Sequence, residues 1–213
     1  MKLTRAEWTV IFIVVMSFML AFVLYPIVPE KLVSHWDMYG EPNGVMSKFW
    51  GLFLMPFISV ALFLFFIIFP KIDPKSGNIE KFRNYFDRFI VSLFVFLFYI
   101  FVLTLFWNIG SPVPIIPFLS AALGLFFFSV GSLVSHSEIN WTIGIRTPWT
   151  LSSETVWKKT HKLGGILFKI TGGIVVLSIL VPQFSFVIVI TSILLAVFIS
   201  VVYSYILYAK EKK

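Results

Sequence analysis

Four long stretches of this sequence contain no Asp, Glu, Lys or Arg: residues 8–29, 49–70, 89–137 and 170–209. A helix needs about 20 apolar residues to cross a hydrocarbon core about 30 Å thick. The first two stretches each match one crossing. The other two are about twice as long, and each contains proline near its middle, within 108–114 and 182–185. Proline lacks a backbone donor and ends helices, so each break predicts a tight turn between two crossings.

The sequence therefore predicts an all-α, polytopic membrane protein, with about six transmembrane helices in a single membrane domain, 1–213. Hydrophobic residues make up 59% of the chain and charged residues 13%, whereas soluble domains average about 45–50% and about 25%. Transmembrane β-strands would alternate apolar and polar residues, but residues 63–69 are all apolar. The predicted spans are roughly 8–28, 49–69, 89–108, 115–135, 163–181 and 184–208.

Basic side chains divide unequally between the two sides of this arrangement. Of the 17 Lys and Arg, all except Lys31 and Lys48 fall on the side that carries both chain ends. Loops rich in Lys and Arg stay in the cytoplasm, so the N-terminus and the C-terminus are both expected to be cytoplasmic. This asymmetry and attraction to anionic lipid headgroups explain the net charge of +7. Direct contact with nucleic acid is therefore not predicted.

The outer loop, 29–48, is the only sizeable connection predicted on the outer side. His35, Asp37 and Glu41 carry potential ligand atoms, but without Cys or a second nearby His they form a weak pattern, and no metal is predicted. Glycines in the loop favour turns that close it on its own backbone. A ligand arriving from outside would meet this loop first, and its candidate contact residues are His35, Trp36, Gly40, Glu41 and Lys48.

The inner loop, 136–162, is the most polar and most varied stretch of the chain. Pro148 ends any preceding helix. Ser152 is predicted to cap a short helix that runs from Ser153 toward the fifth span. Spacings of four, three and four residues place one set of side chains on a single face of this helix: Trp157, His161, Gly164 and Phe168.

Two interpretations of the inner loop remain open. In the first, its helix lies in the interface and anchors the fifth span. In the second, a packed polar cluster holds a ligand or partner, with Arg146 pairing or stacking on tryptophan. The candidate members are Asn140, Gly144, Arg146, Thr147, Pro148, Trp149, Trp157 and His161. In the fifth span, small residues at one face predict close helix packing, and they are Gly164, Gly165, Gly172 and Gly173.

Several patterns of catalysis and transport are missing from the sequence. No Asp, Glu, Arg or His lies in the middle of a predicted span. A charge there costs at least about 2.5–3.5 kcal/mol and is kept for ion or proton translocation, so its absence argues against a pump. The sequence also lacks P-loop, HExxH and GxSxG motifs. A protein that is not an enzyme, with no catalytic residues and no cofactor, is therefore predicted.

The inner loop closely resembles the signature of the SdpI family, membrane proteins named for immunity to a sporulation-delaying peptide toxin. The matching residues are Asn140, Gly144-Ile145-Arg146-Thr147-Pro148-Trp149-Thr150-Leu151-Ser152-Ser153, Trp157, Thr160-His161 and Gly164-Gly165. The outer loop looks like the N-terminal domain that accompanies this signature, through Val28-Pro29, His35-Trp36, Gly40-Glu41-Pro42-Asn43-Gly44 and Ser47-Lys48. Together with six spans, the resemblance covers nearly the whole chain.

The resemblance implies a multi-pass protein of a prokaryotic plasma membrane that protects its host from a membrane-active antimicrobial peptide. It also implies signalling, by capture of a cytoplasmic transcriptional repressor at the membrane when the toxin is present. The implied partners are the lipid bilayer, the peptide toxin from outside and the repressor. Two other functions stay open: a transporter of small molecules or lipids, and a membrane enzyme that uses Arg146 and His161.

Overall fold

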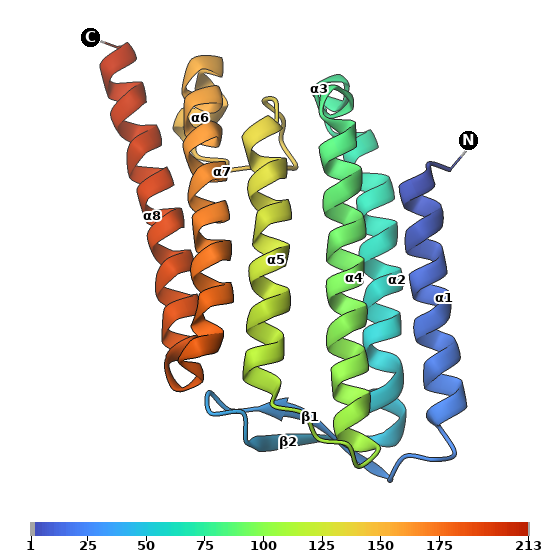
Figure 1. The fold of residues 1–213 in the computed structure, drawn as a ribbon. Helices are drawn as coiled ribbons and strands as arrows, with labels where there is room; N and C mark the ends of the chain where they lie inside the picture. The colour runs from blue at the N-terminus through green and yellow to red at the C-terminus, as the bar shows by residue number, and fades with distance from the viewer. Residues whose placement is uncertain (1–2, 213) are drawn as a thin grey trace.

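The computed structural model describes residues 3–212. Six long helices run between the two ends of the molecule (Figure 1): α1 (Arg5–Leu24), α2 (Lys48–Ile72), α4 (Arg83–Asn108), α5 (Ile115–His136), α7 (Glu154–Leu177) and α8 (Ser185–Glu211). Both chain ends lie at one end, the termini end, together with the short helices α3 (Ser76–Lys81) and α6 (Pro148–Ser152). A hairpin of β1 (Lys31–Trp36) and β2 (Pro42–Ser47) lies at the opposite end, the hairpin end.

All six long helices are long and apolar enough to cross a membrane, which confirms the predicted polytopic all-α architecture. α1 begins at Arg5 rather than near residue 8, because Thr4 and Glu7 form a capping box. α7 is one continuous helix, so the predicted short helix and the predicted fifth span are a single element. Lys2 and Lys213, which contribute to the predicted charge asymmetry, lie outside the described residues.

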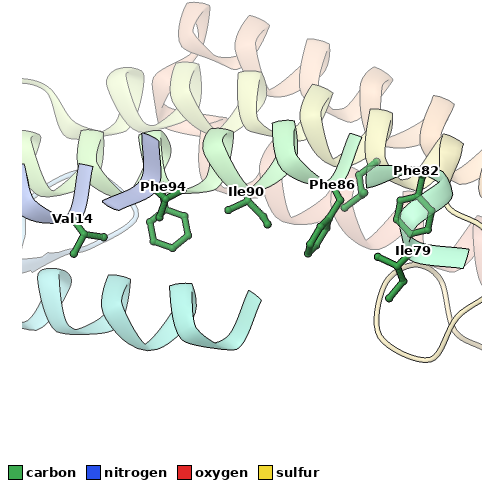
Figure 2. Packing of buried hydrophobic residues seen from close by; sticks show 8 residues of the cluster. Val14, Ile79, Phe82, Phe86, Ile90 and Phe94 are labelled. Carbon is green, nitrogen blue, oxygen red and sulfur yellow. The ribbon is translucent and has the colours of Figure 1, made fainter. Parts of the chain in front are cut away.

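Helices α1, α2 and α4 form one half of the molecule around a core rich in phenylalanine. Apolar side chains from α1 and α4 meet along the length of this half, and α3 closes the core at the termini end. Figure 2 shows six members of this core, which are Val14, Ile79, Phe82, Phe86, Ile90 and Phe94. Apolar packing alone does not fix the direction of the helices. Arg83 of α4 adds a polar contact between helices, because its Nη2 lies 3.3 Å from Oε1 of Glu7 on α1. Its Nε lies 2.6 Å from Oδ1 of Asp87, one turn along α4.

Helices α5, α7 and α8 form the other half, in which glycines let α5 and α7 approach closely. A Cβ atom on Gly165 would lie 2.6 Å from the carbonyl oxygen of Gly131. A Cβ atom on Gly172 would lie equally close to the carbonyl oxygen of Gly124. Close backbone approach maximises dispersion contacts between helices that gain nothing from excluding water. The predicted packing face is therefore present, except that Gly173 faces open space.

The hairpin replaces the irregular outer loop expected from the sequence. β1 and β2 are antiparallel, and Gly40 makes the turn between them with φ at +86°. One edge of β1 is closed by a side chain, because Asn108 accepts the N–H of Val33 at 2.8 Å and donates to its carbonyl at 2.9 Å. Leu32 is fully buried against α2. The hairpin is therefore fixed to the helices by one apolar anchor and one amide clamp.

Two neighbouring glycines of α7 allow a matched test of the α5–α7 contact. Gly172→Ala places a methyl group against the backbone of α5, so we expect a loss of about 1–3 kcal/mol in the free energy of unfolding. Gly173→Ala meets nothing within 4 Å and removes a flexible residue from a helix, so we expect no loss and a gain of up to about 1 kcal/mol. Equilibrium unfolding in detergent measures both. Equal stability of the two variants would contradict the glycine contact.

Candidate functional site

The loop that connects α5 to α6 is held from within by Asn140, whose side chain is fully buried. Its Oδ1 accepts the backbone N–H groups of Thr142 at 2.8 Å and Ile143 at 2.6 Å. Its Nδ2 donates to the carbonyls of Glu138 at 2.8 Å and Ile143 at 3.0 Å. An amide offers two donors and two acceptor positions, so Asn140 uses its full capacity on its own loop. A carboxylate there could not donate.

His161 of α7 fixes the next part of this loop. Its Nε2 accepts the backbone N–H of Ile145 at 2.9 Å, and its Nδ1 lies 2.8 Å from the carbonyl of Trp157. Only the neutral imidazole with its proton on Nδ1 makes both bonds. Gly144 passes directly over the ring with φ at +118°, and a Cβ there would lie 2.5 Å from Nε2. Glycine is required at this position both by its conformation and by the available space.

Trp157 completes what we call the His161 cluster, defined as Asn140, Gly144, Ile145, Trp157 and His161. The indole is fully buried and stacks on the imidazole, with ring centroids 3.9 Å apart. Its Nε1 donates to the carbonyl of Ser137 at 2.7 Å. α7 therefore holds the loop near both of its ends, through Trp157 at Ser137 and through His161 at Ile145.

Helix α6, which the sequence did not predict, is capped by two threonines. Thr147 accepts the N–H of Thr150 at 3.1 Å, and Thr150 accepts the N–H of Thr147 at 2.9 Å. The Thr147 hydroxyl also lies 3.2 Å from the Ser204 hydroxyl of α8, so the cap joins α6 to the last helix. Ser153, not Ser152, caps α7 by accepting the N–H of Val156. Pro148 occupies the first turn of α6, where its missing N–H costs nothing.

The expected packing of Arg146 into a cluster with tryptophan does not hold. Its side chain is exposed and donates to the carbonyl of Trp141. Trp149 packs on Tyr205 of α8 instead, with ring centroids 5.1 Å apart. Burying a guanidinium without an acidic partner is costly, and the His161 cluster offers no carboxylate. The predicted set therefore separates into a buried part around His161 and Asn140 and a surface part around Arg146.

Two residues that sequence reasoning missed bind the same loop from the other half of the molecule. Asp73, which follows α2, is buried and accepts the N–H of Trp141 at 2.9 Å and the hydroxyl of Thr142 at 2.5 Å. Asn78 of α3 donates to the carbonyl of Ile139 at 2.8 Å. No local pattern marks these two, because their partners lie more than 60 residues away along the chain. The loop thus bridges the two halves at the termini end.

The candidate residues of the hairpin end are spread over the hairpin and its flanks. His35 is exposed and pairs with Asn43 across the hairpin, while Glu41 is exposed beside the turn. Lys48 forms an ion pair with Glu30 at 2.9 Å. Trp36 packs edge-on against Trp107 of α4, with ring centroids 5.6 Å apart. Among residues 3–212, no three His, Asp or Glu side chains gather as metal ligands.

The buried geometry favours a structural role for His161 over acid–base chemistry. Both ring nitrogens are engaged by the backbone, and the side chain is fully buried. A general base needs a nitrogen within hydrogen-bond reach of its substrate. What the His161 cluster does is hold a loop of defined shape at the termini end, with Arg146 and the exposed lysines of α7 displayed around it.

Two substitutions test the division of the predicted set into a buried part around His161 and a surface part around Arg146. His161→Phe keeps an aromatic ring but leaves the buried N–H of Ile145 without an acceptor, at a cost of about 1–3 kcal/mol in unfolding free energy. Arg146→Lys changes an exposed residue and should stay within about 0.5 kcal/mol of the parent protein. Unfolding in detergent compares the two. A larger loss for Arg146→Lys than for His161→Phe would show that this division is wrong.

Two regions of the chain match known protein families. Residues 137–204, which include most of the loop and the whole of α6 and α7, match the SdpI/YfhL protein family, and residues 12–60 match a domain of unknown function, DUF1648. The immunity protein SdpI of Bacillus subtilis (strain 168) is 30% identical over 203 residues, which cover 94% of this chain and 94% of that protein. No solved structure matches this chain. The chain belongs to the SdpI family.

Proposed function

We propose that this protein is an immunity protein of a prokaryotic plasma membrane, which protects its host from a membrane-active peptide toxin. The observation that carries the proposal is the similarity to an immunity protein over nearly the full length of both chains. That similarity extends across all six apolar helices, the hairpin and the loop around His161. A multi-pass protein of this kind works where a membrane-active peptide does its damage.

The proposed orientation places the hairpin end outside the cell. It follows the distribution of basic residues, since within residues 3–212 Lys31 and Lys48 are the only Lys or Arg at the hairpin end. A toxin arriving from outside would meet the hairpin first. The other two connections at that end, 109–114 and 178–184, are short and carry no charge. The exposed side chains His35 and Glu41 and the partly exposed Trp36 are then the proposed contact surface.

The proposed role of the termini end is contact with a cytoplasmic protein, such as a transcriptional repressor captured when toxin is present. In this proposal the His161 cluster fixes the shape of the loop, and Arg146 contacts the partner protein. The guanidinium is exposed and pairs with no carboxylate among residues 3–212. Lys159 and Lys162 also lie exposed on α7, beside Lys158, which pairs with Glu154 at 2.8 Å. Together these groups favour an acidic surface on the partner.

The toxin proposal predicts that the hairpin determines protection. The test expresses each variant in a host that is otherwise sensitive to the toxin. His35→Ala, Trp36→Ala and Gly40→Val should each lower the highest toxin concentration at which this host survives. An interfacial tryptophan is often worth more than 1 kcal/mol, so we expect roughly tenfold for Trp36→Ala. Survival against a panel of membrane-active peptides is the measurement, at matched protein abundance.

Gln183→Ala is the matched control for this assay, because Gln183 is exposed at the hairpin end but lies outside the hairpin. It should leave protection unchanged. Full protection by all three hairpin variants would argue against toxin contact through this surface. Loss of protection in Gln183→Ala as well would point to a general effect of substitutions at the hairpin end.

The proposed orientation can be tested separately, since the chain contains no cysteine. Single cysteines replacing His35, Ser111 or Phe184, which are exposed at the hairpin end, should react with a membrane-impermeant thiol reagent in intact cells. Cysteines replacing Arg146 or Lys159, exposed at the termini end, should react only after the cells are opened. Labelling of position 146 or 159 in intact cells would reverse the orientation.

A further inference from the structure

A cavity of about 410 Å³ lies between the hairpin and helices α2, α4 and α5. Its volume falls within the range of small-molecule sites in proteins, about 300–1,000 Å³. The cavity changes character along its depth. The rim at the hairpin carries Ser34, His35 and Asp37, whereas the deeper walls are apolar and include Leu54, Ile58, Ile100 and Leu103. A ligand that matches this gradient has a polar head and an apolar tail.

The depth of the cavity suits an apolar tail that lies along one leaflet. Trp50 and Ile58 both line it, and eight residues of helix span about 12 Å. That depth is most of one leaflet, since half of the hydrocarbon core is about 15 Å.

Two wall residues show where such a chain would enter. Ile58 is 38% exposed and Trp50 is 52% exposed, although both line the cavity. Ile58 lies well inside the apolar part of α2, where the surroundings are hydrocarbon. The cavity is therefore open sideways at membrane depth, and a molecule already dissolved in the bilayer reaches it without crossing the polar surface. Met46 and Met55 also line it, and their flexible side chains adapt to a chain of variable shape.

We propose that this cavity binds one acyl chain of a phospholipid from the leaflet at the hairpin end. The lipid is then part of the hairpin's support, because it fills the space between the hairpin and three helices. The inference does not rest on the proposed immunity function or on the orientation of the protein, although His35 and Trp36 belong both to the cavity wall and to the proposed toxin surface.

The test uses the purified full-length protein in vesicles of phosphatidylethanolamine and phosphatidylglycerol, three to one, with a trace of phosphatidylglycerol that carries a photoactivatable group in mid-chain. We expect lipid adducts on the cavity walls at Met55 and Leu103, at least threefold above those on Phe57. Phe57 is a fair reference, because it is exposed on α2, two residues from Met55, but does not line the cavity. Unlabelled lipid competes with the photoactivatable lipid. A smaller excess of it should reduce the adducts on the cavity walls than is needed to reduce the adducts on Phe57. Equal labelling at all three positions would overturn the proposal.

Variants that fill the cavity test the site. Leu103→Trp and, independently, Leu54→Trp should remove most of the adduct at Met55 while leaving the adduct at Phe57 unchanged. Unchanged Met55 adducts in a folded variant would overturn the site. Labelling of the cavity walls by a photoactivatable peptide but not by lipid would overturn the lipid as occupant.

Discussion

Hydrocarbon offers no hydrogen bonds, so every backbone N–H and C=O that leaves a helix near the membrane must be satisfied within the chain. This protein meets that demand repeatedly with single polar side chains. Asn108 takes the place of a neighbouring strand beside Val33. Asn140 binds four backbone groups of its own loop, and the imidazole of His161 accepts one more. The non-helical parts of the fold depend on these few amide and imidazole groups.

Other polar side chains, Asp73 and Asn78, join the two halves of the molecule. α4 packs against α5 within the membrane, but polar contacts at the two ends define how the halves meet. At the termini end, Asp73 and Asn78 of the first half bind the backbone of the loop that His161 holds in the second half. At the hairpin end, the cavity is walled by elements of both halves. A displacement at either end must therefore change contacts in both halves, which gives the proposed toxin surface and the proposed partner surface a physical connection.

The six spans could be predicted because charge is excluded from hydrocarbon, and this constraint acts on every residue of a span. A close helix contact of α7 could be predicted from its glycines, because small residues let helix backbones approach, but α5 could not be identified as the partner. Within the inner loop, the residue types were sufficient to select His161 and Trp157 but not to separate them from Arg146. That separation depends on Gly144, whose left-handed turn carries the chain over the imidazole and leaves Arg146 outside. Asp73 was missed because its partners are distant in sequence. The hairpin was missed although its strands are neighbours in sequence, because Pro42 and Gly44 are unfavourable residues for a strand.

The amide clamp on β1 has a consequence for biogenesis. Val33 and Asn108 are separated by 75 residues, and ribosomes add about 5–20 residues per second. The edge of β1 therefore waits roughly 4–15 s after its synthesis before the side chain that completes it exists. α1 is already made when this interval begins and α2 is made during it, while the hairpin between them carries open backbone groups. The order of synthesis thus makes the fourth helix, α4, the element that ends the exposure of this strand.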